Sequence, residues 1–445
     1  MPILTEEEAR RVVGRVLDAA RADAVEVSVG SRDGGNTRFA NNGVTTAGQV
    51  TDVTVAVTAS FGTRSGAATT NGLDDDGLVE VVRRAEAAAR LAPEDPEHVE
   101  PLEPVDYPEI EAFHPATAGF GPAERAEVAA AAIGEAVARE AVVAGFLESW
   151  SQGLATANSA GLFGYHPQTW LEYTNTVRTP DGAGSGWAGV RLHDAAGLDA
   201  AARARIAAEK AIASRDPRPL EPGDWPVILE PAAVAVMAGA LVGQMDARRA
   251  MEGRSYLSAP GGGTRLGETL LAPSITIETD PAHAVAPGRA WASQQLPARR
   301  TVWFREGTVD ALQFDRHWAR EQGEAPLPTS TNLILHGGEG SLEDLIRGTA
   351  RAVLVTRFWY IRSLNPRDLT LTGLTRDGTF LVEDGRIAHA VNNFRWNESP
   401  VRLFAAAEAM SRSERVSDED WGVVPSFVPA LRASSFHFSS VSQAV

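Results

Sequence analysis

Histidine and carboxylate side chains come closest to a metal-binding pattern between Asp315 and Glu321. His317 and Glu321 are four residues apart, so on a helix both side chains would lie on one face and could share a metal ion. Asp315 adds a second carboxylate just before them. The same pattern is typical of an exposed helix with a polar face, and this interpretation is favoured. His317 and Glu321 are kept as an alternative metal site.

Other catalytic chemistries lack the residues that they need. The chain has no cysteine, which excludes thiol catalysis, disulfides and thiolate zinc sites. It contains no G-x-S-x-G motif of a serine hydrolase. Its one lysine, Lys210, lies in an alanine- and arginine-rich helical segment. The three glycines at 261–263 precede a threonine and lack a P-loop lysine, which favours a flexible loop over a phosphate site.

A strand-forming segment carries arginine beside aromatic residues. In a strand, Arg357 and Trp359 would share one face, and Tyr360 and Arg362 the other. Arginines beside aromatic rings would suit an extended peptide, whereas core packing alone would also explain the aromatic residues. Both interpretations stay open. Weaker candidates for peptide contact in the loop that follows are Asn392, Asn393, Arg395 and Asn397.

Composition limits the partners of the protein. The 445 residues are 44% hydrophobic and 22% charged, with a net charge of -17. Such an acidic protein lacks the basic surface that binding to nucleic acid or to anionic membranes requires. The N-terminal residues are charged and do not resemble a signal peptide, and no apolar run is long enough to span a bilayer. We expect a soluble, cytoplasmic protein.

The order of elements predicts two domains of an α+β fold. Residues 1–220 should form a mixed α/β domain, with a helix capped by Thr5 and Glu8 and a second helix at Asp74–Leu91. Gly34-Gly35 is expected to turn the chain between two strands. Residues 221–445 should form a mostly antiparallel β domain, with hairpin turns at Asp377-Gly378 and Asp384-Gly385.

The segment Leu229–Ser255 lies at the centre of the predicted C-terminal domain. Pro231 suits a first helical position, and apolar residues follow at helical spacing. Gly253 is a plausible end for one long helix. Because the first half, up to Gly243, is apolar on every side, this helix should be buried inside the domain.

Long phrases of the sequence resemble the TldD/PmbA (TldD/TldE) proteins of prokaryotes. The resemblance covers most of the chain and includes the phrases AARLAPEDP, ATANSAGLFGYH, LPARRT and GGEGSLEDLI. Its strongest block is VTRFWYIRSLNPRDLTLTGLTRDGTFLVEDGRI at Val355–Ile387, followed by NNFRWNESP. The chain is therefore identified as a member of this family, which implies the two-part fold described above.

The resemblance also implies where a metal site would lie. In the active TldD branch, the buried helix carries H-E-x-x-x-H zinc ligands, and a cysteine near the C-terminus supplies another. Aligned on Gly253-Arg254-Ser255, those helix positions are Ala238, Gly239 and Gly243. None of these residues can bind a metal, and the chain lacks cysteine. The chain is thus closer to the TldE/PmbA branch, which lacks the zinc motif.

The function implied by the resemblance is that of a partner subunit in a metallopeptidase complex. The chain would pair with a TldD-like subunit that carries zinc, and the pair would cut unfolded peptides in proteolysis or peptide maturation. This chain would hold no cofactor and contribute chamber wall, peptide contacts and stability. Two alternatives stay open: a metallopeptidase with an unrecognised metal site, and a stand-alone homodimeric peptide-binding or scaffold protein.

Overall fold

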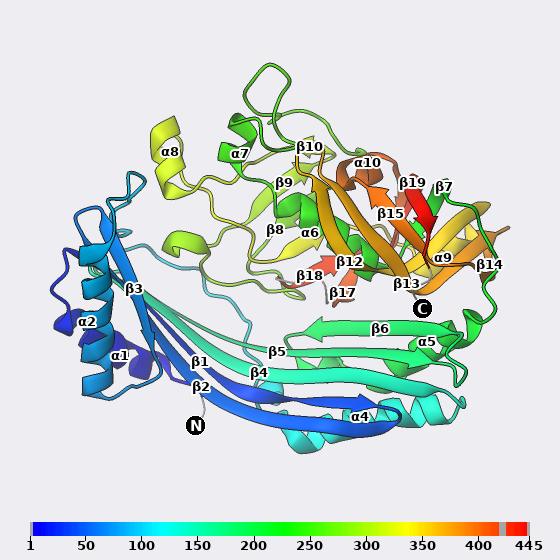
Figure 1. Ribbon diagram of the computed structural model, residues 1–445, viewed down its shortest axis with the longest axis horizontal. Helices are drawn as coiled ribbons and strands as arrows, with labels where there is room; N and C mark the ends of the chain where they lie inside the picture. Colours follow the sequence, from blue (N-terminus) through cyan, green and yellow to red (C-terminus); the bar gives the residue numbers. More distant parts are fainter. Residues whose placement is uncertain (1–2, 418–423, 443–445) are drawn as a thin grey trace.

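The N-terminal part of the computed structural model is one long antiparallel sheet. The structure describes residues 3–417 and 424–442. The sheet has the strand order β3-β2-β1-β4-β5-β6, and its middle strands are unusually long (Figure 1). Its strands are β1 (Ala24–Ala40), β2 (Gly43–Phe61), β3 (Arg64–Thr70), β4 (Val142–Asn158), β5 (Phe163–Arg178) and β6 (Ser185–Leu192).

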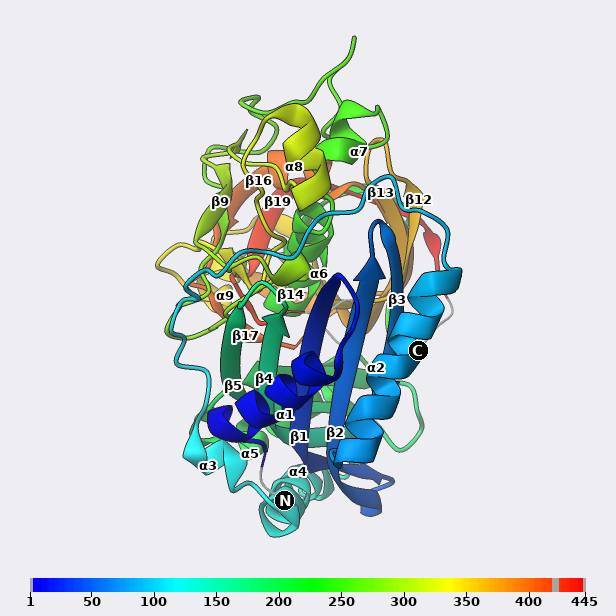
Figure 2. The same cartoon turned by 90° about the vertical axis from the view of Figure 1, so that its left-hand side faces the viewer.

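Helices cover one face of this sheet in two pairs. Helices α1 (Glu6–Ala19) and α2 (Asp75–Leu91) pack on β1 and β2 near one end, as Figure 2 shows. Helices α4 (Pro122–Val137) and α5 (Ala200–Ala213) pack on β4 to β6 near the other end. Two short elements, α3 (Pro115–Ala118) and a 3-10 turn at Ala195–Gly197, complete this part. The predicted capping box of Thr5 and Glu8 is confirmed.

The predicted turn at Gly34-Gly35 is wrong, because β1 runs straight through both glycines. A Cβ atom on Gly34 would lie 2.2 Å from the carbonyl oxygen of Ser149, and one on Gly35 would lie 2.0 Å from that of Gly48. Both are distances at which atoms overlap. These glycines therefore let neighbouring strands approach closely, a role that a pattern of turn residues does not distinguish from a turn.

The C-terminal part contains two further sheets and a buried helix. One sheet has the order β10-β9-β8-β11-β18-β17. In the other, β12, β7, β19, β15 and β13 form a closed ring, because β12 also pairs with β13. The strands of the first of these sheets are β8 (Ile277–Thr279), β9 (Thr301–Arg305), β10 (Thr308–Val309), β11 (Leu333–Leu335), β17 (Glu414–Val416) and β18 (Ser426–Val428). The strands of the second are β7 (Gly223–Leu229), β12 (Arg351–Asn365), β13 (Thr370–Glu383), β14 (Arg386–Ala390), β15 (Phe394–Glu398), β16 (Ala407–Met410) and β19 (Leu431–Val441).

Helix α6 (Pro231–Val242) lies between these two sheets, as predicted for the buried helix. It contacts β12 and β7 on one side and β11, β17 and β18 on the other. The remaining helical elements are short: α7 (Ala247–Met251), a 3-10 turn at Ser293–Gln295, α8 (Arg316–Gln322), α9 (Leu342–Arg347) and α10 (Pro400–Ala405). The fold is therefore α+β, with a C-terminal part dominated by sheets, as the sequence predicts.

Two local predictions in the C-terminal part are wrong. The single helix expected to end at Gly253 stops at Gly243, and α7 restarts after the Asp246 carboxylate accepts a hydrogen bond from the Arg249 backbone N–H. Asp377-Gly378 is not a hairpin turn, because β13 continues through it. Both residues have positive φ, 55° and 121°, and form an irregularity in the pairing of β12 with β13. The hairpin turn at Asp384-Gly385 is confirmed.

The sequence also predicts short strands near Val423–Leu431 and Phe436–Val441 at the end of the chain. The strand expected from Phe436 to Val441 is confirmed within β19. The strand expected from Val423 begins at a position outside the described residues, and β18 itself spans Ser426–Val428. None of the helices in the described ranges combines the length and the apolar character that crossing a bilayer requires.

Candidate functional site

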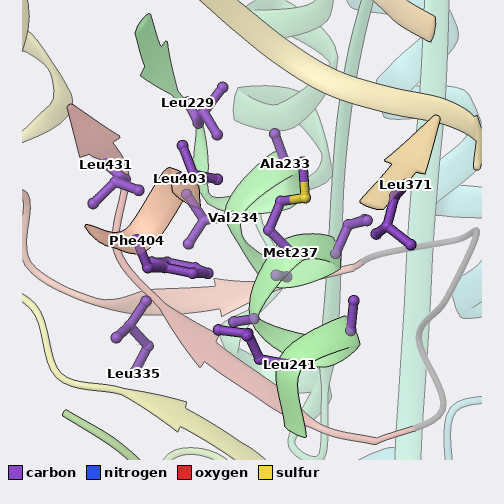
Figure 3. Close-up of a cluster of buried hydrophobic side chains, with 14 of the residues drawn as sticks. Leu229, Ala233, Val234, Met237, Leu241, Leu335, Leu371, Leu403, Phe404 and Leu431 are labelled. Carbon is purple, nitrogen blue, oxygen red and sulfur yellow. The ribbon is translucent and has the colours of Figure 1, made fainter. Parts of the chain in front are cut away.

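Helix α6 has an apolar sequence that favours burial on all sides. Pro231 takes the first helical position, and β7 leads directly into it. Its apolar side chains, among them Val234, Met237 and Leu241, are fully buried. Figure 3 shows them among leucine and phenylalanine side chains from β7, β11, β13, α10 and β19. The helix is therefore a rigid central element, on which a side chain that pointed outward would be held in place.

The three residues that the resemblance aligns with zinc ligands lie at the C-terminal end of α6, two of them inside the helix and Gly243 as its C-cap. Ala238 is fully buried, whereas Gly239 is partly exposed and Gly243 is exposed. A Cβ atom on Gly239 would meet no atom within 4 Å, so there is room for a side chain at this point. The space is present, but no nitrogen, oxygen or sulfur ligand is. Zinc binds through such donor atoms, so these three residues do not fit the metal.

The alternative metal site is not assembled around His317. The predicted helix forms as α8, and the Asp315 carboxylate caps it by accepting a hydrogen bond from the Trp318 backbone N–H at 2.6 Å. The Nδ1 atom of His317 lies 3.2 Å from Nη2 of Arg320, a cation that a bound metal would repel. Across the described part of the chain, no three His, Asp or Glu side chains come together as a metal site.

Arg357 is held in a buried ion pair that joins the two parts of the chain. Its Nε and Nη2 both lie 2.8 Å from Oδ2 of Asp377, whose side chain is fully buried. The other oxygen of Asp377 accepts a hydrogen bond from the Ser185 hydroxyl of β6 at 2.5 Å. The guanidinium of Arg357 also lies 5.0 Å from the ring centroid of Trp187 on β6. Through Asp377, β12 and β13 are thus fixed to the N-terminal sheet.

Trp359, Tyr360 and Arg362 form an exposed cluster of rings and arginines. Tyr360 and Arg362 lie together as expected. The expected separation of Trp359 from Tyr360 is wrong, because the strand pairing shifts between Trp359 and Arg362 and Tyr360 has a φ of 56°. The Trp359 and Tyr360 rings therefore lie together, 5.7 Å between centroids. Arg376 covers the Trp359 ring at 4.1 Å and Arg362 the Tyr360 ring at 4.4 Å. Tyr360 itself is 52% exposed.

The asparagines after β14 hold strands together. The side-chain oxygen of Asn393 accepts hydrogen bonds from Thr375 and Thr379, at 3.2 and 2.8 Å. The side-chain oxygen of Asn392 accepts one from the Leu220 backbone N–H at 2.7 Å. Arg395, on β15, is exposed. Peptide contact by Asn393 and Arg395 stays a prediction.

Sequence reasoning missed Asp377, which links β12 and β13 to Ser185 of β6. An Asp-Gly pair is typical of a hairpin turn, and that interpretation concealed its carboxylate. The signal that could have identified it is the continuous β pattern on both sides, TLTGLT and TFLVE, which leaves little reason for the chain to reverse. Where a strand continues through Asp-Gly, an irregularity in the strand pairing is expected. Such an irregularity changes the direction in which the side chain points.

The family is decided by two matches to known domains. Residues 222–440 match the domain described as the PmbA/TldA metallopeptidase C-terminal domain, and residues 25–89 match PmbA/TldA metallopeptidase domain 1. The chain belongs to the PmbA/TldD family. Membership makes the protein metallopeptidase-related. A search of curated proteins finds no match to this chain.

Three solved structures share the fold at low sequence identity. TldE from Thermococcus kodakarensis is 18% identical with a TM-score of 0.86, over 96% of this chain and 99% of that one. A protein from Thermotoga maritima, described as a proposed modulator of a DNA gyrase, is 17% identical with a TM-score of 0.84, over 96% and 99%. One from Bacteroides thetaiotaomicron with a similar description is 18% identical with a TM-score of 0.84, over 99% and 100%.

Proposed function

We propose that this protein is a TldE/PmbA-like, non-catalytic subunit of a PmbA/TldD-type peptidase complex. The observation that carries the proposal is the C-terminal end of α6, where Ala238, Gly239 and Gly243 stand at the positions that the resemblance aligns with zinc ligands. The helix keeps its buried position and leaves space at Gly239. Its scaffold is thus retained without the donor atoms. Zinc and the hydrolytic chemistry would belong to a TldD-like partner subunit.

The contribution of this chain would be to hold an unfolded peptide. The cluster of Trp359, Tyr360, Arg362 and Arg376 offers aromatic faces and guanidinium groups that suit the side chains of an extended peptide. Arg357 is less suited, because its guanidinium is already bound by Asp377. Among the residues suggested by sequence, Tyr360 and Arg362 are therefore the strongest candidates for peptide contact.

Reconstitution tests the proposal. The chain is expressed alone, the TldD-like subunit alone, and both together, and hydrolysis of an unfolded peptide is measured for each. We expect no hydrolysis above background from this chain alone and co-elution of the two subunits on size exclusion. Peptide cleavage by this chain without a partner would overturn the proposal. A stable homodimer that does not bind the TldD-like subunit would favour the scaffold alternative.

The His317 alternative has its own control. His317→Ala should leave the activity of the two-subunit complex unchanged, because this residue lies on α8 beside Arg320. Loss of both activity and bound metal in that variant would instead assign a metal site to this chain.

A further inference from the structure

A cleft of about 550 Å³ lies between the two parts of the chain, apart from the exposed end of α6. Helix α5 and strand β6 of the N-terminal part form one wall. The start of α6, helix α9 and strands β13, β14 and β17 form the other. Clefts of roughly 300–1,000 Å³ between structural units are the usual size and place for small-molecule sites.

The only lysine of the 445 residues lies in this cleft. Nζ of Lys210 is 2.6 Å from Oε2 of Glu230, and the two side chains are 17% and 13% exposed. The second oxygen of Glu230 accepts a hydrogen bond from the buried Thr356 hydroxyl at 3.2 Å. Glu230 is therefore committed on both oxygens, whereas the ammonium of Lys210 has three donors and uses one of them on Glu230.

Six more charged side chains line the same cleft: Arg203, Glu209, Glu343, Arg412, Glu414 and Arg415. Arg203, Arg412 and Glu414 come from α5, from the residues before β17, and from β17. The Glu414 carboxylate interacts electrostatically with both arginines and with Lys210. Within the described residues, none of these three side chains makes a hydrogen bond, so their polar atoms can serve a ligand. Cationic and anionic groups thus face one space.

The remaining lining of the cleft is apolar. Ile206 of α5 is 39% exposed and Ile387 of β14 is 45% exposed, which is unusual for isoleucine in a folded protein. Phe380, Leu354 and Ile346 continue this surface behind them. A ligand that covered the two isoleucines would remove apolar surface from water while its charged ends met the groups described above.

We propose that this cleft binds a small zwitterion with an aliphatic side chain: a free amino acid or a short peptide. The carboxylate of the ligand would accept hydrogen bonds from Arg412 and Lys210, and its ammonium would donate to Glu414. The site goes beyond the proposed function and does not depend on it, because no residue of the exposed end of α6 takes part. A ligand here would bridge the two parts of the chain.

The test uses the dipeptide Leu-Leu on the full chain. Biosynthetic incorporation of 13C-labelled lysine labels Lys210 alone and leaves its ammonium with all three donors. Because there is one lysine, the Lys210 side-chain signal reports on this cleft alone. We expect that signal to shift saturably with a Kd on the order of 0.1–1 mM, in keeping with a ligand of this size.

Capped ligands and matched variants decide which groups take part. Glu414→Gln should weaken Leu-Leu about tenfold but leave N-acetyl-Leu-Leu unaffected, since a charged hydrogen bond is lost only with the free ammonium. Arg412→Gln should weaken Leu-Leu about tenfold and leave Leu-Leu-amide unaffected. Arg84→Gln and Glu127→Gln, on exposed faces of α2 and α4, are the controls and should change nothing.

Either of two results would overturn the proposal. One is a Lys210 signal that does not move at Leu-Leu concentrations far above the expected Kd. The other is an equal affinity for free and capped peptides in every variant, which would reduce the effect to non-specific apolar contact.

Discussion

At the scale of single residues, glycine has three different roles in this chain. Gly239 lies in a helix with open space where a side chain would be. Gly186 lies under α5, where a Cβ atom would be 2.1 Å from the carbonyl oxygen of Ala207. Gly385 closes a hairpin with a φ of 76°. The same residue type therefore marks open space beside a helix, a tight contact and a turn.

The contrast predicts opposite effects of one substitution. Gly239→Ala should raise the free energy of unfolding by about 0.5–1 kcal/mol, because alanine loses less backbone entropy in a helix and meets no atom. Gly186→Ala should lower it by about 1–3 kcal/mol through overlap with α5. Chemical denaturation of both variants provides the measurement. A loss of stability in Gly239→Ala would show that the space at α6 is smaller than the structure indicates.

His166 makes stability depend on pH. It is 2% exposed, with its ring 6.2 Å from that of Trp291, and burial lowers its pKa from 6.5 to about 4, with a smaller effect from Arg289. In the unfolded chain, His166 therefore binds a proton below about pH 6.5, whereas in the folded chain it does so only below about pH 4. As the pH is lowered between those values, the free energy of unfolding should therefore decrease. At pH 4.5, His166 should account for a decrease of about 2–3 kcal/mol.

The variant His166→Phe tests this effect. It keeps an aromatic ring beside Trp291 and removes the titrating group, so the decline of unfolding free energy between pH 7 and 4.5 should be smaller by about 2–3 kcal/mol. His317→Gln, on α8, is the control and should follow the unmodified protein. An unchanged pH profile in His166→Phe would contradict the account of burial.

At the scale of elements, strand β12 changes role along its length. Its first half is buried in the closed ring, and its end beyond Ile361 is exposed. The change occurs at Tyr360, which has a backbone conformation that is strained for an aromatic residue. This irregularity turns the ring outward beside Trp359. Strain at an exposed aromatic residue is typical of a position retained for binding.

Tyr360→Gly should therefore separate stability from function. Glycine adopts positive φ without strain, so we expect the free energy of unfolding to stay equal or rise by up to about 1 kcal/mol. Peptide hydrolysis by the complex with the TldD-like subunit should fall, through a higher KM. Leu364→Ala, at a residue on the same strand that is 54% exposed, is the matched control. Unchanged KM in Tyr360→Gly would exclude Tyr360 from peptide contact.

Sequence patterns predicted the helices and strands better than they predicted where these elements end or become irregular. The Thr5 cap, the second helix and the buried α6 follow from local signals, namely a capping box, an acidic first turn and an apolar run after Pro231. The straight path through Gly34-Gly35 and the irregularity at Asp377-Gly378 depend on atoms from distant strands. Local sequence contains no record of those contacts. The ion pairs of Lys210 with Glu230 and of Arg357 with Asp377 were missed for the same reason.

At the scale of the whole molecule, polar contacts at several places join the two parts. The ion pair of Arg357 and Asp377, together with Ser185, joins β12 and β13 to β6. The pair of Lys210 and Glu230 joins α5 to the start of α6. Figure 1 shows the C-terminal part lying along the long sheet that these contacts reach. Because β12 is joined to the N-terminal sheet, its exposed end is held in a fixed position relative to that sheet.

Asp377→Asn should loosen this arrangement. It removes the charge that balances the Arg357 guanidinium, whose side chain is 12% exposed, so unfolding free energy should fall by about 3–5 kcal/mol. Proteolysis in the connecting residues 215–222 should become faster. Asp310→Asn, in an exposed pair with Arg305, should cost less than about 1 kcal/mol. Equal losses in both variants would contradict a special role of Asp377.

The most direct measurement for the central claim is the zinc content of the protein purified gently from its native host, with partners still attached. The account predicts zinc only in fractions that contain a second, H-E-x-x-x-H-bearing chain, and none in this chain after the two are separated. Stoichiometric zinc in this chain without a partner would contradict the account, and the protein would then have to be treated as the enzyme.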